Sequence, residues 1–189
     1  MIIQKLIPIG TKRRSGQAIL GVKFIVEHDT GNLNSTAMQN VNYFINSANE
    51  IEASAHTFID DINIIECIPL SEKAWHVRRN VNIDNTIYGV DANDWAIGVE
   101  LCFFTDIERT KKAYANYVQY IKELSQKYNL PRTSHVAHAT LDPTRRTDPL
   151  NAFKTIGKTW EQFLQDLYPQ SNSPKDEIKA KIIALLNQL

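Results

Sequence analysis

Residues 96–104 read AIGVELCFF and form the most apolar strand-like stretch of this 189-residue chain. Such a run, with no regular alternation of polar residues, is typical of a strand covered on both faces, so we place it at the centre of a sheet. Its one charged residue is Glu100. An unpartnered carboxylate is costly to bury, which favours a functional role for Glu100 over a structural one.

Further strands are predicted on both sides of this stretch. Residues 22–27 (VKFIVE) are mostly β-branched or aromatic and lie between Gly21 and the polar segment HDTGN, which is typical of a buried strand. Residues 53–59 and 62–68 flank a pair of aspartates, and this pattern indicates a hairpin. A last short strand is predicted at residues 134–137.

Three amphipathic helices are predicted between and after these strands. The first begins at a capping residue, Ser35 or Thr36, and runs to about residue 48. The second follows Thr105, which has an acidic residue three positions later in the spacing of a capping box, and it ends before Pro131. The third is expected to be continuous over about residues 151–167.

The alternation of strands and helices predicts an α/β domain with a mixed central β-sheet flanked by helices, over residues 1–168. Residues 169–174 are interpreted as a linker, and residues 175–189 as a C-terminal amphipathic helix. Residues 71–95 form a long polar stretch inside the domain. A loop of that length in a compact domain is usually functional.

Charge and composition narrow the classes of partner. The 21 basic and 21 acidic residues cancel, so nucleic acid is not an expected partner. No stretch approaches the roughly 20 apolar residues of a membrane span, and residues 1–10 lack a signal-peptide cleavage site. We therefore expect synthesis in the cytoplasm without a signal peptide. Cys67 and Cys102 lie in apolar runs and are expected to be buried free thiols.

Two histidines stand at the ends of predicted strands. His28 follows the first buried strand, His138 follows the last, and Asp148 lies in the proline-bounded loop beyond it. Side chains just past the ends of neighbouring strands can converge at one edge of a sheet, and two imidazoles with one carboxylate are a ligand set of catalytic zinc. Asp142 is a rival ligand, although its place before Pro143 is typical of a turn.

Five segments, read in order, resemble one known family. They are IVEHDT, SAHTFID, KAWH, AIGVEL and HATLDPTRRTDP, and the resemblance runs in this order from about residue 22 to residue 153. Together they resemble the type-2 N-acetylmuramoyl-L-alanine amidases, which cut the amide bond between N-acetylmuramic acid and L-alanine in bacterial peptidoglycan. That family includes phage endolysins, bacterial autolysins, cytosolic wall-recycling amidases and animal peptidoglycan recognition proteins.

The resemblance implies a zinc enzyme with its metal site at one edge of the sheet. His28, His138 and Asp148 match the three zinc ligands of the family. Glu100 matches the strand glutamate that faces the water at the metal and exchanges protons with it. A peptidoglycan fragment, or muropeptide, is the implied substrate.

Further positions match less directly. Arg146 stands where the family usually has a lysine beside the zinc, which leaves charge stabilisation open but puts proton donation in doubt. Trp75 and His76 match a loop that lines the substrate groove. His56 matches a histidine-bearing strand and is expected to border the site or to lie in the core. His135 is expected to be structural, because a regular strand would turn it to the face opposite His138.

Several functional alternatives remain open. Some family members recognise peptidoglycan without cutting it, but those typically lack a complete ligand set, which this chain has. A metallopeptidase is disfavoured because the helical His-Glu-x-x-His motif is absent. Residues 175–189 are interpreted as the start of a wall-binding or assembly region, which could also form an oligomer. This region and the linker before it favour an endolysin over a cytosolic recycling amidase. An endolysin would act on the cell wall after release by lysis.

Overall fold

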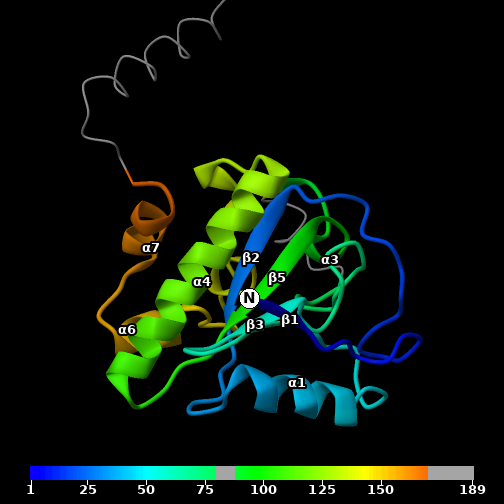
Figure 1. Ribbon diagram of the computed structural model, residues 1–189. Coiled ribbons are helices and arrows are strands. Elements are labelled where there is room, and N and C mark those ends of the chain that lie inside the picture. Colours follow the sequence, from blue (N-terminus) through cyan, green and yellow to red (C-terminus); the bar gives the residue numbers. More distant parts are fainter. Residues whose placement is uncertain (80–87, 170–189) are drawn as a thin grey trace, which may run out of the picture.

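The computed structural model describes residues 1–79 and 88–169 (Figure 1). One six-stranded sheet forms its centre, in the order β1-β4-β3-β5-β2-β6. Strands β3 and β4 pair antiparallel and the other neighbours pair parallel, which confirms the predicted mixed sheet. The strands are β1 (Ile2–Gln4), β2 (Phe24–Asp29), β3 (Thr57–Ile59), β4 (Ile64–Glu66), β5 (Ala96–Leu101) and β6 (His135–Ala137).

The stretch AIGVEL forms β5 and lies between β3 and β2, as its apolar character predicts. Five of its six residues are buried, and Glu100 is the partly exposed one. Strand β2 is buried along its whole length and runs two residues further than predicted. His28 therefore lies within the strand and not after it, in register with Glu100.

The helices are α1 (Ala37–Asn46), α3 (Ala92–Trp95), α4 (Ile107–Tyr128), α5 (His138–Leu141), α6 (Leu150–Thr155) and α7 (Trp160–Leu167). Thr36 caps α1 in a capping box with Gln39, as expected from the sequence. The predicted cap of α4 was wrong by one residue. Asp106, and not Thr105, accepts hydrogen bonds from the first-turn N–H groups, since its carboxylate reaches both Glu108 N and Arg109 N.

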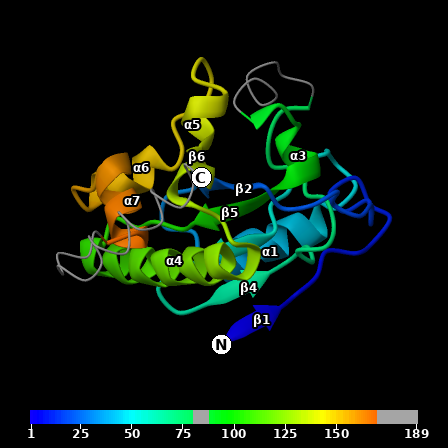
Figure 2. The ribbon, with the colours of Figure 1, turned by 90° about the horizontal axis from the view of Figure 1, so that it is seen from above.

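The single helix predicted over residues 151–167 is in fact two helices, α6 and α7. Gly157 separates them with a φ of +68°, a left-handed conformation that glycine adopts without steric cost. Thr159 then starts α7 with a new capping box that involves Gln162. Both helices pack beside α4, as Figure 2 shows.

The two faces of the sheet carry different helices. On one face, the Tyr120 hydroxyl of α4 contacts Thr57 Oγ1 at 2.9 Å and Glu66 Oε1 at 3.1 Å. Because side chains alternate along a strand, Phe58 points to the other face, where its ring meets Phe44 of α1 at a centroid distance of 5.1 Å. Helices α4 and α1 therefore cover opposite faces.

The N-terminal segment adds an edge strand, β1, that the sequence did not predict. Further along, Arg13 is fully buried although it is charged. Its Nε donates to the Ser47 carbonyl at 3.0 Å, and its guanidinium carbon lies 4.3 Å from the centre of the Phe44 ring. These contacts fasten the segment to the end of α1.

Within the described residues, no helix is long and apolar enough to cross a membrane. Cys67 and Cys102 are buried free thiols, as predicted. The predicted C-terminal helix at 175–189 lies outside the described residues, as does the linker at 169–174 beyond its first residue.

Candidate metal centre and active-site cavity

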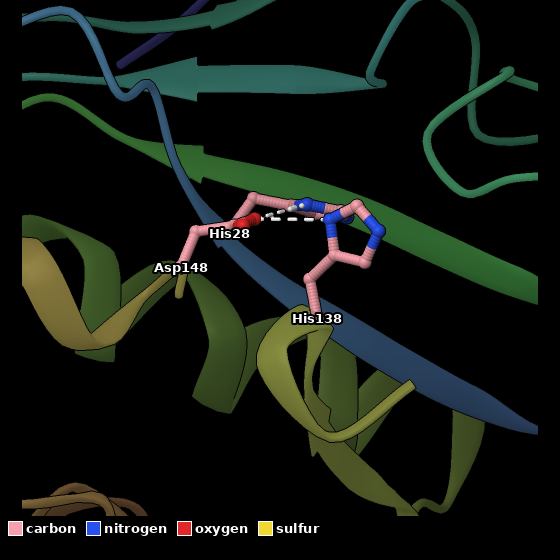
Figure 3. A group of neighbouring side chains, drawn as sticks. All are labelled: His28, His138 and Asp148. Atoms are coloured by element: carbon pink, nitrogen blue, oxygen red, sulfur yellow. Dashed lines mark hydrogen bonds and ion pairs between the residues drawn. The ribbon is translucent and has the colours of Figure 1, made fainter. Parts of the chain in front are cut away.

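Three side chains converge on the face of the sheet opposite α4. Asp148 Oδ2 lies 2.9 Å from His28 Nδ1 and 3.0 Å from His138 Nδ1 (Figure 3). All three residues are buried, and their candidate ligand atoms lie within 4.8 Å of one another. The structure thus brings together the two histidines and the aspartate that the sequence singles out.

Neighbouring elements hold each of these residues in place. His28 belongs to β2, and His138 opens α5 directly after β6, which pairs with β2. The carbonyl of Asp148 accepts a hydrogen bond from Ala139 N at 2.9 Å, so the loop beyond α5 folds back onto its first turn. The three candidate ligands therefore sit on strand β2, on the first residue of the helix that follows its neighbour β6, and on a tethered loop.

Asp29 is a supporting residue that sequence analysis missed. Its carboxylate accepts hydrogen bonds from Ala152 N at 3.1 Å and from the side chain of Asn151 at 3.3 Å, which joins the end of β2 to α6 just beyond Asp148. It also accepts from Gly31 N at 3.1 Å. An Asp-Thr-Gly segment signals that local turn, but nothing in the sequence indicates the contact with α6.

The protonation of the cluster suits a divalent cation. Burial, and then the neighbouring His138, lower the pKa of His28 to about 4, so its ring is neutral at neutral pH. Burial alone would raise the pKa of Asp148, but hydrogen bonds with His138 and His28 outweigh it and lower the pKa. Two imidazoles and a carboxylate are a donor set that fits a metal with an open coordination position.

A cavity of about 290 Å³ opens beside the cluster. It is lined by all three candidate ligands and by four more of the residues expected at the site, Trp75, His76, Glu100 and Arg146. Other lining residues, which sequence analysis did not single out, include Phe44, Ala53, Ser54 and Asn151. A second cavity of about 590 Å³ lies at the C-terminal ends of α4 and α7, away from these residues.

Glu100 lines this cavity, and one of its carboxylate oxygens has no hydrogen-bond partner among the described residues. Among the described residues, its Oε2 is a buried oxygen without a hydrogen-bond partner. Burial raises the pKa of Glu100 well above its usual range, the charges of Asp148 and Asp29 add to the shift, and Arg146 opposes it. A carboxyl group held in this way has a strong affinity for a proton.

The two arginines of the loop have different surroundings. Arg145 Nε donates to Asp142 Oδ2 at 2.9 Å, so Asp142 is engaged in its own turn and is not part of the histidine cluster. Arg146 is exposed and lines the cavity, where its charge acts on both Glu100 and His28. Both arginines line the cavity, and Arg146 is the one whose charge acts on Glu100 and on His28.

His56, which the sequence placed among the candidate substrate-binding residues, is not among the residues that line the cavity. It is fully buried, its Nδ1 accepts from Gly98 N at 3.0 Å, and its Nε2 donates to the Glu72 carbonyl at 3.0 Å. Both ring nitrogens are therefore used to join backbone segments. This corresponds to the core position that the sequence left open for His56.

His135 is structural, as expected. Its Nδ1 lies 2.7 Å from Glu27 Oε1, and its Nε2 lies 2.9 Å from the Tyr168 hydroxyl, which donates to the Leu130 carbonyl at 2.7 Å. The side chains of Glu27 and His135 are fully buried. This cluster fastens the residue after α7 to the edge of the sheet.

Comparison with known proteins places this arrangement in a family. Residues 18–151 match the model of the N-acetylmuramoyl-L-alanine amidase family. The amidase BlyA of Bacillus subtilis is 33% identical over 139 residues, which cover 66% of this chain and 35% of BlyA. The amidase XlyA of the same organism is 29% identical over 159 residues, which cover 81% of this chain and 50% of XlyA. The chain thus spans half or less of the length of these relatives.

Solved structures give the same result for the fold. The catalytic domain of XlyA superposes with a TM-score of 0.69 at 27% identity, over 88% of this chain and 99% of that one. A mutant endolysin from Bacillus subtilis superposes with a TM-score of 0.72 at 28% identity, over 88% of this chain and 98% of that one. By its sequence and its fold, this chain belongs to the N-acetylmuramoyl-L-alanine amidase family.

Proposed function

We propose that this domain is a zinc-dependent amidase that hydrolyses the bond between N-acetylmuramic acid and L-alanine in peptidoglycan. The observation that carries the proposal is the buried cluster of His28, His138 and Asp148, which lies beside Glu100 at a cavity. Zinc is favoured among divalent metals because two imidazoles and one carboxylate are a ligand set of hydrolytic zinc sites.

In the proposed reaction, the three candidate ligands hold the metal and Glu100 transfers protons. Bound zinc would lower the pKa of water from about 15.7 towards 7 and polarise the scissile carbonyl. Glu100 takes the proton of the attacking water and passes it to the departing nitrogen of alanine. The water oxygen becomes part of the new lactyl carboxylate, and alanine leaves with a free amino group.

Two cavity residues are assigned supporting roles. Arg146 places a permanent positive charge where the oxyanion of the tetrahedral intermediate develops, and it cannot act as a proton donor. Trp75 offers an apolar wall for the substrate. Its ring is packed under the guanidinium of Arg79, whose Cζ lies 4.3 Å from the ring centre.

Among the biological settings, an endolysin that acts on the cell wall is favoured over a cytosolic recycling amidase. The mutant endolysin from Bacillus subtilis superposes with a TM-score of 0.72 over 88% of this chain, whereas the 1,6-anhydro-N-acetylmuramyl-L-alanine amidase AmpD of Salmonella typhimurium matches only 60% of it. A recognition module without activity is disfavoured because the three ligands and Glu100 are all present at the cavity.

Mass analysis of purified cell walls after digestion tests the proposal directly. The expected products carry new lactyl carboxylates on the glycan strands and free N-terminal alanines on the released stems, and zinc should be present at one equivalent per chain. His138→Ala is the matched control and should yield neither product. Products cut at glycosidic bonds or within the stem, or full activity in a metal chelator, would overturn it.

A further inference from the structure

His76 lies directly behind one of the candidate metal ligands. Its Nδ1 is 3.2 Å from His28 Nε2, the ring nitrogen that points away from Asp148. Its own Nε2 is 3.3 Å from the carbonyl oxygen of Ala96. Both histidines are buried, with 7% of His76 and 1% of His28 exposed. A row of hydrogen bonds thus runs from the backbone of β5 through His76 to His28, one of the three candidate metal ligands.

The direction of each bond follows from the carbonyl at the end of this row. A carbonyl oxygen only accepts, so the proton of a neutral His76 ring must be on Nε2, and Nδ1 is left as an acceptor. His28 must then donate to it from its Nε2, which leaves His28 Nδ1 with a free lone pair. In this tautomer the Nδ1 lone pair points at Asp148 Oδ2, 2.9 Å away, and a bound metal ion would take the place of the proton that His28 and Asp148 otherwise share.

The sequence around His76 is arranged to allow this contact. His76 packs against Gly98 in the middle of β5, where a Cβ atom would come within 2.5 Å of His76 Cγ. No side chain larger than hydrogen fits at Gly98 while the ring stays in this place. The backbone of His76 is fixed as well, because Asn93 Oδ1 accepts from His76 N at 3.0 Å.

We propose that His76 is a positioning residue that acts through His28, by holding the ring of this ligand in the tautomer and orientation that present Nδ1 to the metal. Gly98 supports the same positioning role, because its lack of a side chain leaves the space that the His76 ring occupies. The inference rests on the proposed metal site. It gives His76 a different task from Trp75, its neighbour in the sequence, which lines the cavity and whose indole Nε1 has no hydrogen-bond partner in the described residues.

Zinc affinity, measured by competition with a chromogenic chelator, tests this role without reference to activity. His76→Leu keeps bulk but removes the acceptor and should weaken zinc binding by about 10–100-fold, the usual effect of losing such a partner. His76→Asn places an amide oxygen near the position of Nδ1 and should restore affinity to within about threefold of the parent. Gly98→Ala, which displaces the ring, should resemble His76→Leu.

Two further measurements separate positioning from damage to the fold. The thermal midpoint of the metal-free protein should differ little between His76→Leu and His76→Asn, whereas the visible spectrum of the cobalt-loaded protein should change in His76→Leu and return in His76→Asn. Trp75→Phe is the matched control and should bind zinc like the parent.

The outcomes distinguish this inference from the proposed function. A parent that binds zinc through His138 but cuts no amide bond would refute the proposed function and leave the role of His76 standing. Zinc affinity of His76→Leu within twofold of the parent, or a His76→Asn protein that binds no better than His76→Leu, would refute the positioning role.

Discussion

Replacing Glu100 with glutamine should separate catalysis from stability. Glutamine has nearly the same shape but cannot take a proton from water, so hydrolysis of a soluble muropeptide should slow by about 10²–10⁴-fold. At about 1.36 kcal/mol per factor of ten, this corresponds to about 3–5 kcal/mol of transition-state stabilisation. Zinc content should stay at one equivalent, because Glu100 is not among the three candidate ligands.

The same change should not destabilise the fold. Glu100 Oε2 is a buried oxygen without a hydrogen-bond partner in the described part of the chain, so the folded state gains little from its charge. Since the side chain is partly exposed to the cavity, we expect a gain in unfolding free energy of at most about 1 kcal/mol. For a domain of this size, that is a rise of about 2–4 °C in the thermal midpoint.

The assay combines turnover on a muropeptide, metal analysis and scanning calorimetry of the metal-free protein. Glu66→Gln is a matched control, because Glu66 is a buried glutamate of β4 whose carboxylate accepts from Tyr120 on the opposite face of the sheet. It should keep full turnover. Turnover of Glu100→Gln within tenfold of the parent would refute the proton-transfer role, and loss of zinc would make Glu100 a support of the metal site.

Three further changes have defined outcomes. Zinc at 100 times its dissociation constant should stabilise the folded parent protein by about 2.7 kcal/mol, so its removal with a chelator should lower the thermal midpoint by about 5–10 °C. His138→Ala should show no such zinc-dependent shift in calorimetry. Arg146→Ala should cut turnover by roughly 10²-fold while zinc is retained, and Arg146→Lys should restore much of the rate. Steady-state turnover of Arg146→Ala within twofold of the parent would show that Arg146 is only a solvated charge. His135→Ala leaves Glu27 buried without its partner and should cost about 3–5 kcal/mol in urea denaturation, and a loss below 1 kcal/mol would contradict the structural role of this pair.

The core strands could be predicted because their apolar character is written into consecutive residues. Strand β1 could not, since its three residues are exposed and its pairing with β4 depends on a hairpin more than sixty positions away. The break between α6 and α7 carried a signal, Gly157 followed by a threonine cap, but the helical pattern on both sides of it masked that signal.

The candidate metal ligands could be singled out from the sequence because the predicted strand ends beside the two histidines and the family resemblance agree. The separate roles of His56 and His76 could not be predicted from the sequence, since the groups that their rings contact come from distant segments of the chain. His56 joins backbone segments, whereas His76 contacts His28, and only the three-dimensional neighbours separate these cases.

The candidate ligands lie far apart along the chain. His28 and Asp148 are separated by 120 positions, and the β5 and α4 segments lie between them. A bound ion would therefore act as a cross-link that closes a loop of most of the domain, and such closure restricts the unfolded chain more as the loop lengthens. It also sets an order of events: a polypeptide emerging from the ribosome carries one ligand until almost the whole domain has been made. Metal loading should accordingly be a late step of folding, and unfolding should begin with, or require, release of the ion.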